Sequence, residues 1–214
     1  MILHIIARFF LFIWCKLFFG YRVYGKRNMP EKGGAIVAPN HASYLDPIFV
    51  GIGSSRLLNY IARETLFKNF LFGWLIRTTG AFPIKRNFHD LGAIKEAIRR
   101  LKSGRPVLIF PEATRTLDGN LQPVKGGISF LAHSAGVPVV PVYIKGSFDV
   151  WPKGAKCIRC SRVSVYFGKP MYFNGSSDDY QAFADSIMEN IAKLRDEPRY
   201  KPCVTGQKRG FVTG

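Results

Sequence analysis

The stretch AIVAPNHASYLDP, residues 35–47, joins a short apolar run to a polar segment that contains one histidine and one aspartate. The run Ala35–Pro39 has the length and composition of a buried strand, and His41 and Asp46 follow it directly. A strand that ends in such residues predicts a layered α/β domain, because ligands of these domains gather at the carboxyl ends of the strands.

The same alternation of short apolar runs and helical stretches continues along the chain. Further strands are predicted over residues 57–62, 81–85, 106–110, 138–144 and 162–168, and helices over residues 70–80, 89–104, 127–136 and 178–197. Prolines in the strand at 138–144 favour an edge strand or a strand end. The order predicts a layered, largely parallel or mixed sheet flanked by helices. Three parts are expected: residues 1–32, a membrane-associated helix with a basic linker; residues 33–196, the catalytic domain; and residues 197–214, a loose basic tail.

The charge of the chain predicts an anionic partner. Its 214 residues include 31 Lys and Arg against 14 Asp and Glu, a formal net charge of +17. Such an excess suits an anionic bilayer surface, a phosphate-bearing substrate or nucleic acid. Nucleic acid is disfavoured, because no recognition helix or RNA-binding aromatic signature accompanies the charge.

The first twenty residues are apolar and aromatic, with His4, Arg8 and Lys16 as interruptions. On a helix these three share one side, with Cys15 beside them. A spanning helix is possible at this length, but the polar stripe favours a helix that lies in the membrane interface. The basic residues Arg22, Lys26 and Arg27 would then meet anionic head groups. The alternative is an amphipathic helix packed on its own domain.

The four cysteines indicate neither a zinc site nor an extracellular protein. Cys157 and Cys160 form the single CxxC, and no second pair completes a metal site. The CxxC leads into a strand, whereas a redox pair is expected at the start of a helix. We interpret the cysteines as structural thiols in a reducing compartment, and expect no metal or organic cofactor.

His41 and Asp46 have the residue types of a general base and its orienting carboxylate. Five residues along a regular helix rotate by about 140°, so the pair needs a turn or an irregular first helical turn. The alternative is that Asp46 only caps a helix that has Pro47 at its first position. Two other polar clusters at strand ends favour the pair: Lys85-Arg86, and the segment PEATRT at 111–116.

With these residues in view, the chain resembles the glycerolipid acyltransferases, the family that includes 1-acylglycerol-3-phosphate acyltransferase. NHASYLD is similar to the HxxxxD motif, GAFPIKR to the second motif, FPEATRTLDGNLQPVKGG to the third and VPVVPVYI to the fourth. The four blocks occur in the family's order between about residues 40 and 144.

The resemblance implies direct acyl transfer. His41, oriented by Asp46, takes the proton from the free hydroxyl of a lysolipid, lysophosphatidic acid, and the oxygen attacks the thioester of acyl-CoA or acyl carrier protein to make phosphatidic acid. Substrate-binding roles are implied for Arg86, Glu112, Thr114, Arg115 and Lys125. The expected location is the cytoplasmic face of the cell membrane, on an anionic surface. The alternatives are another lysolipid acceptor, and a non-catalytic protein that binds anionic membranes.

The chain departs from the family's pattern at Ala113, where the third motif usually has glycine. Glycine permits a positive φ and a close approach of the backbone. The methyl group of Ala113 is therefore expected to narrow the head-group pocket, which leaves the identity of the acceptor open.

Overall fold

The computed structural model describes residues 2–64, 81–84, 91–124 and 126–196. Within these ranges the chain forms a single seven-stranded sheet with the strand order β1-β7-β6-β2-β5-β3-β4. The strands are β1 (Arg22–Tyr24), β2 (Ile36–Pro39), β3 (Asn59–Arg63), β4 (Ala81–Ile84), β5 (Val107–Leu108), β6 (Val139–Lys145) and β7 (Ser164–Phe167). Every neighbouring pair is parallel except β6 with β7. The predicted largely parallel, mixed sheet is therefore confirmed.

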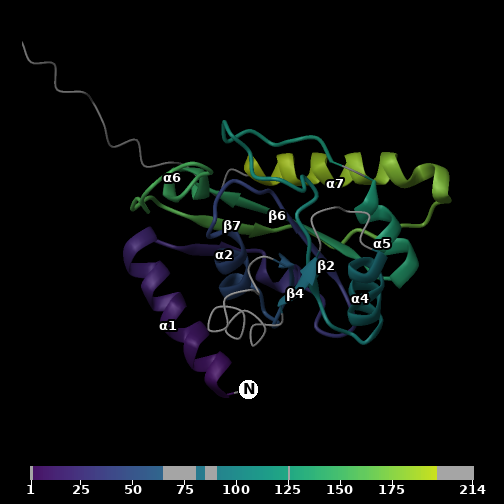
Figure 1. Cartoon of the computed structure of the whole chain (residues 1–214), viewed down its shortest axis with the longest axis horizontal. Coiled ribbons are helices and arrows are strands. Elements are labelled where there is room, and N and C mark those ends of the chain that lie inside the picture. Colours follow the sequence, from purple (N-terminus) through teal and green to yellow (C-terminus); the bar gives the residue numbers. More distant parts are fainter. Residues whose placement is uncertain (1, 65–80, 85–90, 125, 197–214) are drawn as a thin grey trace, which may run out of the picture.

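The helices are α1 (Ile2–Phe19), α2 (Asp46–Gly53), α4 (Leu91–Lys102), α5 (Gly127–Ala135), α6 (Ser147–Val150) and α7 (Tyr180–Arg195), with short 3₁₀ turns at Lys26–Asn28 and Ser177–Asp179. Figure 1 shows α7 above the central strands, α4 and α5 at one end, and α1 and α2 below the strands. Contacts link α4 with α5, α5 with α7, and α1 with α2. The sheet is thus covered on both faces.

Alternating side chains of the central strands supply two apolar cores. On β2, Val37 belongs to the core beneath α1 and α2, whereas Ile36 and Ala38 belong to the core beneath α4, α5 and α7. Such strands read as continuous apolar runs because both faces are buried. The apolar runs predicted as strands at 35–39 and 106–110 accordingly contain β2 and β5.

β6 occupies the interior of the sheet, so the edge position suggested by its prolines is wrong. The Pro141 carbonyl accepts a hydrogen bond from the Gly168 amide, 2.8 Å between N and O, so this residue's backbone faces the β7 side. The β6–β7 pairing starts only at Val142 with Phe167. The missing N–H of Pro141 therefore lies just beyond the end of the ladder, where a proline can be tolerated.

The N-terminal region is more closely integrated with the sheet than a linker would be. β1, which the sequence pattern did not reveal, pairs with β7. Cys15, Phe19 and Tyr21 are buried in the core beneath α1 and α2. By contrast, Cys157 and Cys160 are exposed free thiols, so a packing role fits Cys15 alone among these three. The helix predicted at 70–80 and the tail from 197 lie outside the described residues.

Candidate active site

The carboxyl ends of β2 and β5 bring His41 and Glu112 together. These two strands are parallel neighbours, and each continues into a loop at the same edge of the sheet. Glu112 Oε1 accepts a hydrogen bond from the His41 backbone N–H, 3.2 Å between the heavy atoms. The Thr116 N–H donates to the His41 carbonyl at 2.9 Å. Two segments about 70 residues apart in the chain thus form one loop pair.

The side chains of His41 and Asp46 are in hydrogen-bond contact, with 2.9 Å between His41 Nδ1 and Asp46 Oδ2. Asp46 is the first residue of α2, and its side chain is fully buried. The same Oδ2 atom accepts the N–H groups of Ala42 and Ser43, each at 2.7 Å. The carboxylate therefore points back into the turn at 41–43 and makes no side-chain cap for α2. The geometry is that of the orienting carboxylate and not of the helix cap.

This contact fixes the chemistry of the imidazole. A carboxylate that accepts from Nδ1–H leaves the lone pair on Nε2, the nitrogen that can then take a proton. Three contacts converge on Asp46 Oδ2 and hold the carboxylate beside the imidazole, where it can stabilise the imidazolium that proton transfer would create. The arrangement is equipped for general-base catalysis.

Phe110 packs against the His41 ring and was missed by the sequence analysis. The two ring centroids are 3.7 Å apart and the planes meet at 18°, a stacked arrangement. Phe110 follows β5 and lies on the same side of the sheet as Leu108 and Val37. This period-two alternation was the available signal. The imidazole is therefore held by a hydrogen bond at Nδ1 and by an aromatic ring across its face.

Buried polar contacts hold the His41 turn to the rest of the domain. The Asn40 side chain accepts from the Ile144 N–H at 2.7 Å and donates to the Ile144 carbonyl at 3.3 Å. Ser43 Oγ and the Tyr44 N–H both donate to the Trp151 carbonyl at 3.1 Å. The turn is thereby anchored to β6 and to the segment after α6, which gives His41 and Asp46 a rigid support.

Glu112 is a buried carboxyl with an altered proton affinity. Its residue is 5% exposed. Burial raises the pKa of Glu112 to about 7, and the negative charge of Asp46 adds to that rise, while the backbone amides of His41 and Gln122 oppose it. The group therefore titrates close to neutral pH, next to the backbone of His41.

Arg115 presents a cation at the same loop pair. Its guanidinium carbon lies 3.7 Å from the centroid of the Tyr44 ring, a cation–π contact. Among the described residues its Nε has no hydrogen-bond partner. A guanidinium stacked by its face keeps its edge for an anion, and that edge suits the bidentate binding of phosphate.

The remaining predicted site residues are described only in part by the structure. Thr114 is exposed, and its N–H donates to the Glu112 carbonyl at 2.7 Å. Arg86 and Lys125 lie outside the described residues. Ala113 has φ of 61°, the one positive φ among the described non-glycine residues. The backbone conformation that favours glycine is thus kept here with alanine.

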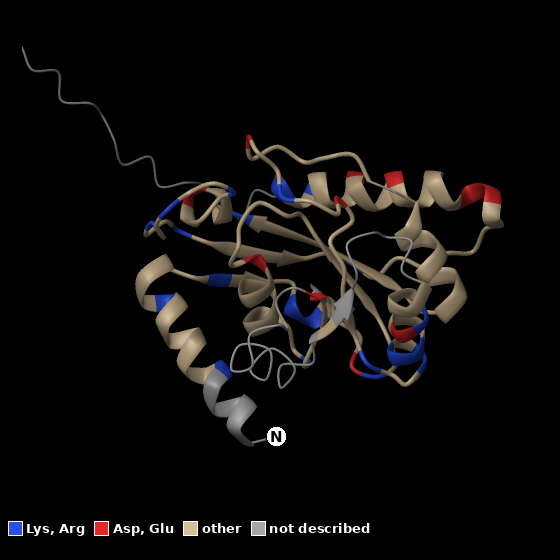
Figure 2. Cartoon of the chain, viewed as in Figure 1, with Lys and Arg blue, Asp and Glu red and all other residues tan. Residues whose placement is uncertain are grey.

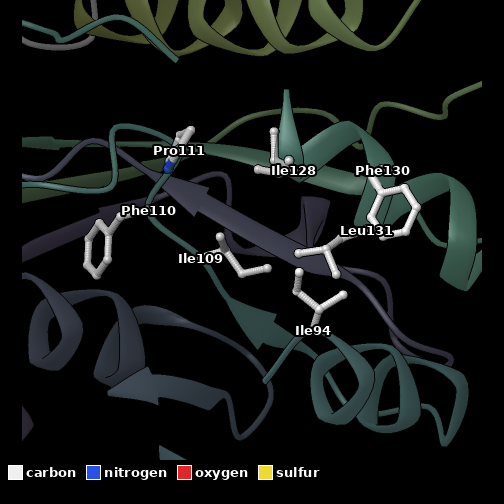
Figure 3. Close-up of a pocket in the computed structure, with 8 residues that line it drawn as sticks. Ile94, Ile109, Phe110, Pro111, Ile128, Phe130 and Leu131 are labelled. Atoms are coloured by element: carbon white, nitrogen blue, oxygen red, sulfur yellow. The ribbon is translucent and has the colours of Figure 1, made fainter. Parts of the chain in front are cut away.

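An apolar pocket lies at the end of β5 on the α4 and α5 side. It is lined by Ile94, Ile109, Phe110, Pro111, Gly127, Ile128, Phe130 and Leu131. In Figure 3, Ile109 points toward Ile94 and Leu131, whereas the Phe110 ring points away from them. Among the described residues, the lining has no charged side chain, so it suits a hydrocarbon group. In the described part of the chain, no cluster of three or more His, Cys, Asp or Glu could hold a metal ion.

Comparison with known proteins gives a consistent result. The acyltransferase family profile matches residues 20–145. A 1-acyl-sn-glycerol-3-phosphate acyltransferase of Bacillus subtilis (strain 168) is 30% identical over 184 residues, which cover 83% of this chain and 89% of the relative. A chloroplastic enzyme of the same name from Brassica napus is 32% identical over 194 residues, 89% of this chain, but the match covers only 55% of that longer protein.

A solved structure has the same fold. The crystal structure of the 1-acyl-sn-glycerophosphate (LPA) acyltransferase PlsC from Thermotoga maritima matches with a TM-score of 0.69 and 27% identity. The match covers 84% of this chain and 73% of the other.

Proposed function

This chain belongs to the acyltransferase family, and on that premise we propose that it is a 1-acyl-sn-glycerol-3-phosphate acyltransferase. It transfers a fatty acyl chain from acyl-CoA or acyl carrier protein to the free hydroxyl of lysophosphatidic acid, and the product is phosphatidic acid. The observation that carries the proposal is the contact between His41 Nδ1 and Asp46 Oδ2 at 2.9 Å.

The reaction proceeds by direct attack. His41 Nε2 takes the proton of the acceptor hydroxyl while that oxygen forms a bond to the thioester carbonyl carbon. The carbon–sulfur bond breaks when the tetrahedral intermediate collapses, and the imidazolium returns its proton to the departing thiolate. Asp46 keeps the imidazole in the required tautomer and stabilises the imidazolium. General-base catalysis of this kind contributes roughly 10²- to 10⁴-fold to the rate.

The phosphate of the acceptor is bound by Arg115, whose guanidinium stacks on the ring of Tyr44 in the His41 turn. Arg86 and Lys125 add positive charge, and Glu112 and Thr114 shape the pocket. Orientation of the two substrates by such contacts accounts for a large part of the rate, since positioning alone can contribute roughly 7–11 kcal/mol.

The helix α1 associates with the membrane through its apolar side. Arg8 turns toward the domain and donates to the carbonyls of Ile52 and Ser54 at the end of α2, and Cys15 beside it in the stripe is buried. The opposite side exposes Phe9 (60%), Phe10 (64%) and Leu17 (75%). An amphipathic helix packed on its own domain would bury these side chains instead.

Among the described residues, no helix has the length and hydropathy needed to span a bilayer. In our proposal α1 lies in the interface of the cytoplasmic leaflet, where both the acceptor and the product reside. We keep the division into an N-terminal part (1–32), a catalytic domain (33–196) and a tail (197–214), with β1 from the first part completing the sheet.

The test is thiol release from a long-chain acyl-CoA, or carrier release from the corresponding acyl carrier protein, with lysophosphatidic acid as acceptor in detergent. Wild type is compared with His41→Ala and Asp46→Asn, and His133→Ala serves as the control because His133 is an exposed histidine bonded to Tyr180. We expect turnover in wild type and control, and its loss by 10²-fold or more in the two site variants. Equal activity in His41→Ala would refute the mechanism.

The choice of acceptor needs a second comparison. Lysophosphatidic acid is set against a monoacylglycerol, which has the hydroxyl but no phosphate. A preference for the phosphorylated acceptor that Arg115→Gln abolishes supports the assigned phosphate site. No turnover with any donor in wild type would leave a lipid-binding protein without catalysis.

A further inference from the structure

A basic loop, residues 152–162, connects the His41 turn to the C-terminal end of α1. Its exposed cations are Lys153, Lys156, Arg159 and Arg162, and no Asp or Glu occurs between residues 150 and 177. Figure 1 places α6 and the chain that follows it at the same edge of the molecule as the end of α1, and Figure 2 shows Lys and Arg in that part of the chain. The exposed acid nearest in sequence is Asp149, on α6.

The two ends of the basic loop are held by backbone hydrogen bonds. At the start, the Trp151 carbonyl accepts from Ser43 Oγ and from the Tyr44 N–H, both at 3.1 Å. At the end, the Val163 N–H donates to the Phe19 carbonyl at 2.9 Å, and the Arg22 N–H donates to the Val163 carbonyl at 3.0 Å. The loop thus runs from the candidate active site to the membrane helix.

The loop is also closed on itself. The Arg159 N–H donates to the Val150 carbonyl at 2.8 Å, and Trp151 Nε1 donates to the Ala155 carbonyl at 3.1 Å. Its cations are therefore presented from a structured segment. Ile158, in the middle of the cations, is 45% exposed. An exposed large apolar side chain that has cations on both sides of it along the loop is the pattern of a segment that meets a bilayer interface.

We propose that the basic loop is a second membrane-contact site, which binds the anionic head groups of the leaflet on which α1 lies. The inference rests on the membrane association assigned to α1 above. The continuity of the loop with α1 and its exposed Ile158 favour a bilayer over an acidic protein. With two contacts at the same edge, α1 supplies apolar anchoring and the loop fixes the orientation, so that the His41 turn faces the lipid acceptor.

The experiment is co-flotation of the full-length protein with vesicles of phosphatidylcholine alone, or with 30% phosphatidylglycerol. The test variant is Lys153→Gln/Lys156→Gln/Arg159→Gln. The matched control is Lys95→Gln/Lys102→Gln/Arg105→Gln, which removes the same charge from exposed residues of α4 and the turn after it. Thermal unfolding of all three proteins shows whether they are folded.

We expect the loop variant to bind the anionic vesicles about 100-fold more weakly than wild type, given the contribution of each cation near an anionic surface, and the α4 control to bind within about threefold of wild type. Binding to phosphatidylcholine vesicles should be equal in all three. An equal loss in both variants would show that only net charge matters and would overturn the proposal.

Turnover separates this proposal from the catalytic one. In detergent, the loop variant should have wild-type activity, whereas on anionic vesicles its activity should fall with its binding. Absence of detergent turnover in wild type would contradict the proposed function without affecting the flotation result. In a different outcome, the loop variant floats with vesicles as well as wild type does and loses turnover only with the acyl carrier protein donor. That result would overturn the proposal and identify an acidic protein as the partner of the loop.

Discussion

At the scale of single residues, the aromatic ring of Phe110 limits how far the His41 imidazole can tilt. Asp46 fixes one edge of the imidazole, and the stack at 3.7 Å restricts rotation about that hydrogen bond. A base whose Nε2 is displaced by about 1 Å can lose on the order of 10²-fold in rate. The HxxxxD pair thus depends on a side chain outside its motif.

We expect Phe110→Leu to lower kcat by about 10- to 100-fold while the KM for lysophosphatidic acid changes little, because the base is misaligned and the phosphate site is intact. The measurement is steady-state thiol release. Phe167→Leu is the control, since it removes a buried ring from the same core without touching His41. Equal losses of kcat in both variants would show that Phe110 contributes only to core packing and does not position His41.

Glu112 makes the stability of the fold depend on pH. The folded state holds this proton to about pH 7, against an ordinary pKa of 4.5. Between these values the unfolded chain has released the proton and the folded protein has not, so this group's contribution makes stability fall as pH rises. A rise of the pKa from 4.5 to about 7 corresponds to roughly 3 kcal/mol.

We therefore expect Glu112→Gln to remove this fall. From pH 5 to pH 8, the free energy of unfolding of the variant should decrease less than that of wild type. Urea unfolding at both pH values measures it, and only the difference between the two proteins is used, because other carboxyls titrate in both. If the two proteins lose equal stability over this range, Glu112 is not the group responsible.

Ala113 has a backbone conformation that glycine adopts without steric cost. At φ of 61° an L-residue is destabilised by roughly 1–2 kcal/mol. Glycine would avoid this strain, but it would also raise the conformational entropy of the unfolded chain, which offsets part of the gain. Ala113→Gly should therefore stabilise the protein by about 0.5–1 kcal/mol, and Ala113→Val should destabilise it. Thermal unfolding of the three proteins tests the order, and a less stable glycine variant would contradict it.

At the scale of elements, α1 has two sides with different partners. Phe19 is 1% exposed and its ring meets Phe49 of α2, with the centroids 5.6 Å apart. Phe18, next to it in sequence, is 52% exposed. The same residue type at adjacent positions therefore serves the core in one case and the proposed membrane contact in the other.

In detergent-free buffer, Phe19→Ala should lower the free energy of unfolding by about 3–5 kcal/mol, as expected for a buried aromatic, and Phe18→Ala by less than about 0.5 kcal/mol. Vesicle binding should show the reverse order, with the larger loss in Phe18→Ala once both variants are confirmed to be folded. Comparable unfolding energies would mean that Phe18 also packs on the domain.

At the scale of the whole molecule, the cations behind the net charge of +17 do not all contribute equally to membrane binding. Figure 2 shows cations on α4 as well as at the α1 edge, and acids along α7. Charge acts on a membrane only within about a Debye length, which is about 10 Å at 0.1 M salt and 3 Å at 1 M. The cations near α1 should therefore dominate membrane binding.

Raising NaCl from 0.1 M to 1 M should weaken binding to anionic vesicles by tenfold or more, and should leave binding to phosphatidylcholine vesicles unchanged or slightly stronger. Co-flotation at both salt concentrations provides the measurement. Salt-independent binding to anionic vesicles would mean that the apolar side of α1 alone accounts for the attachment.

The sequence by itself predicted the strands β2 to β7 and the helices α4, α5 and α7 in their order, the family, and His41 with Asp46 as the candidate pair, but it left the helix-cap role of Asp46 open and did not indicate α6. These features depend on residues close together in the chain: apolar runs of strand length, glycines such as Gly136 that end helices with a positive φ, and a motif of six residues. Local periodicity and turn chemistry depend on neighbouring residues, so they can be predicted without knowledge of the fold.

The tertiary structure alone decided which side chains face one another across the chain. It placed Glu112 on the His41 backbone and Phe110 on its ring, put β6 inside the sheet despite Pro141, added β1 as an edge strand, and turned Arg8 of α1 toward the domain. Each of these contacts depends on which element covers which face. That choice is made by the packing of distant segments, which a local pattern does not encode.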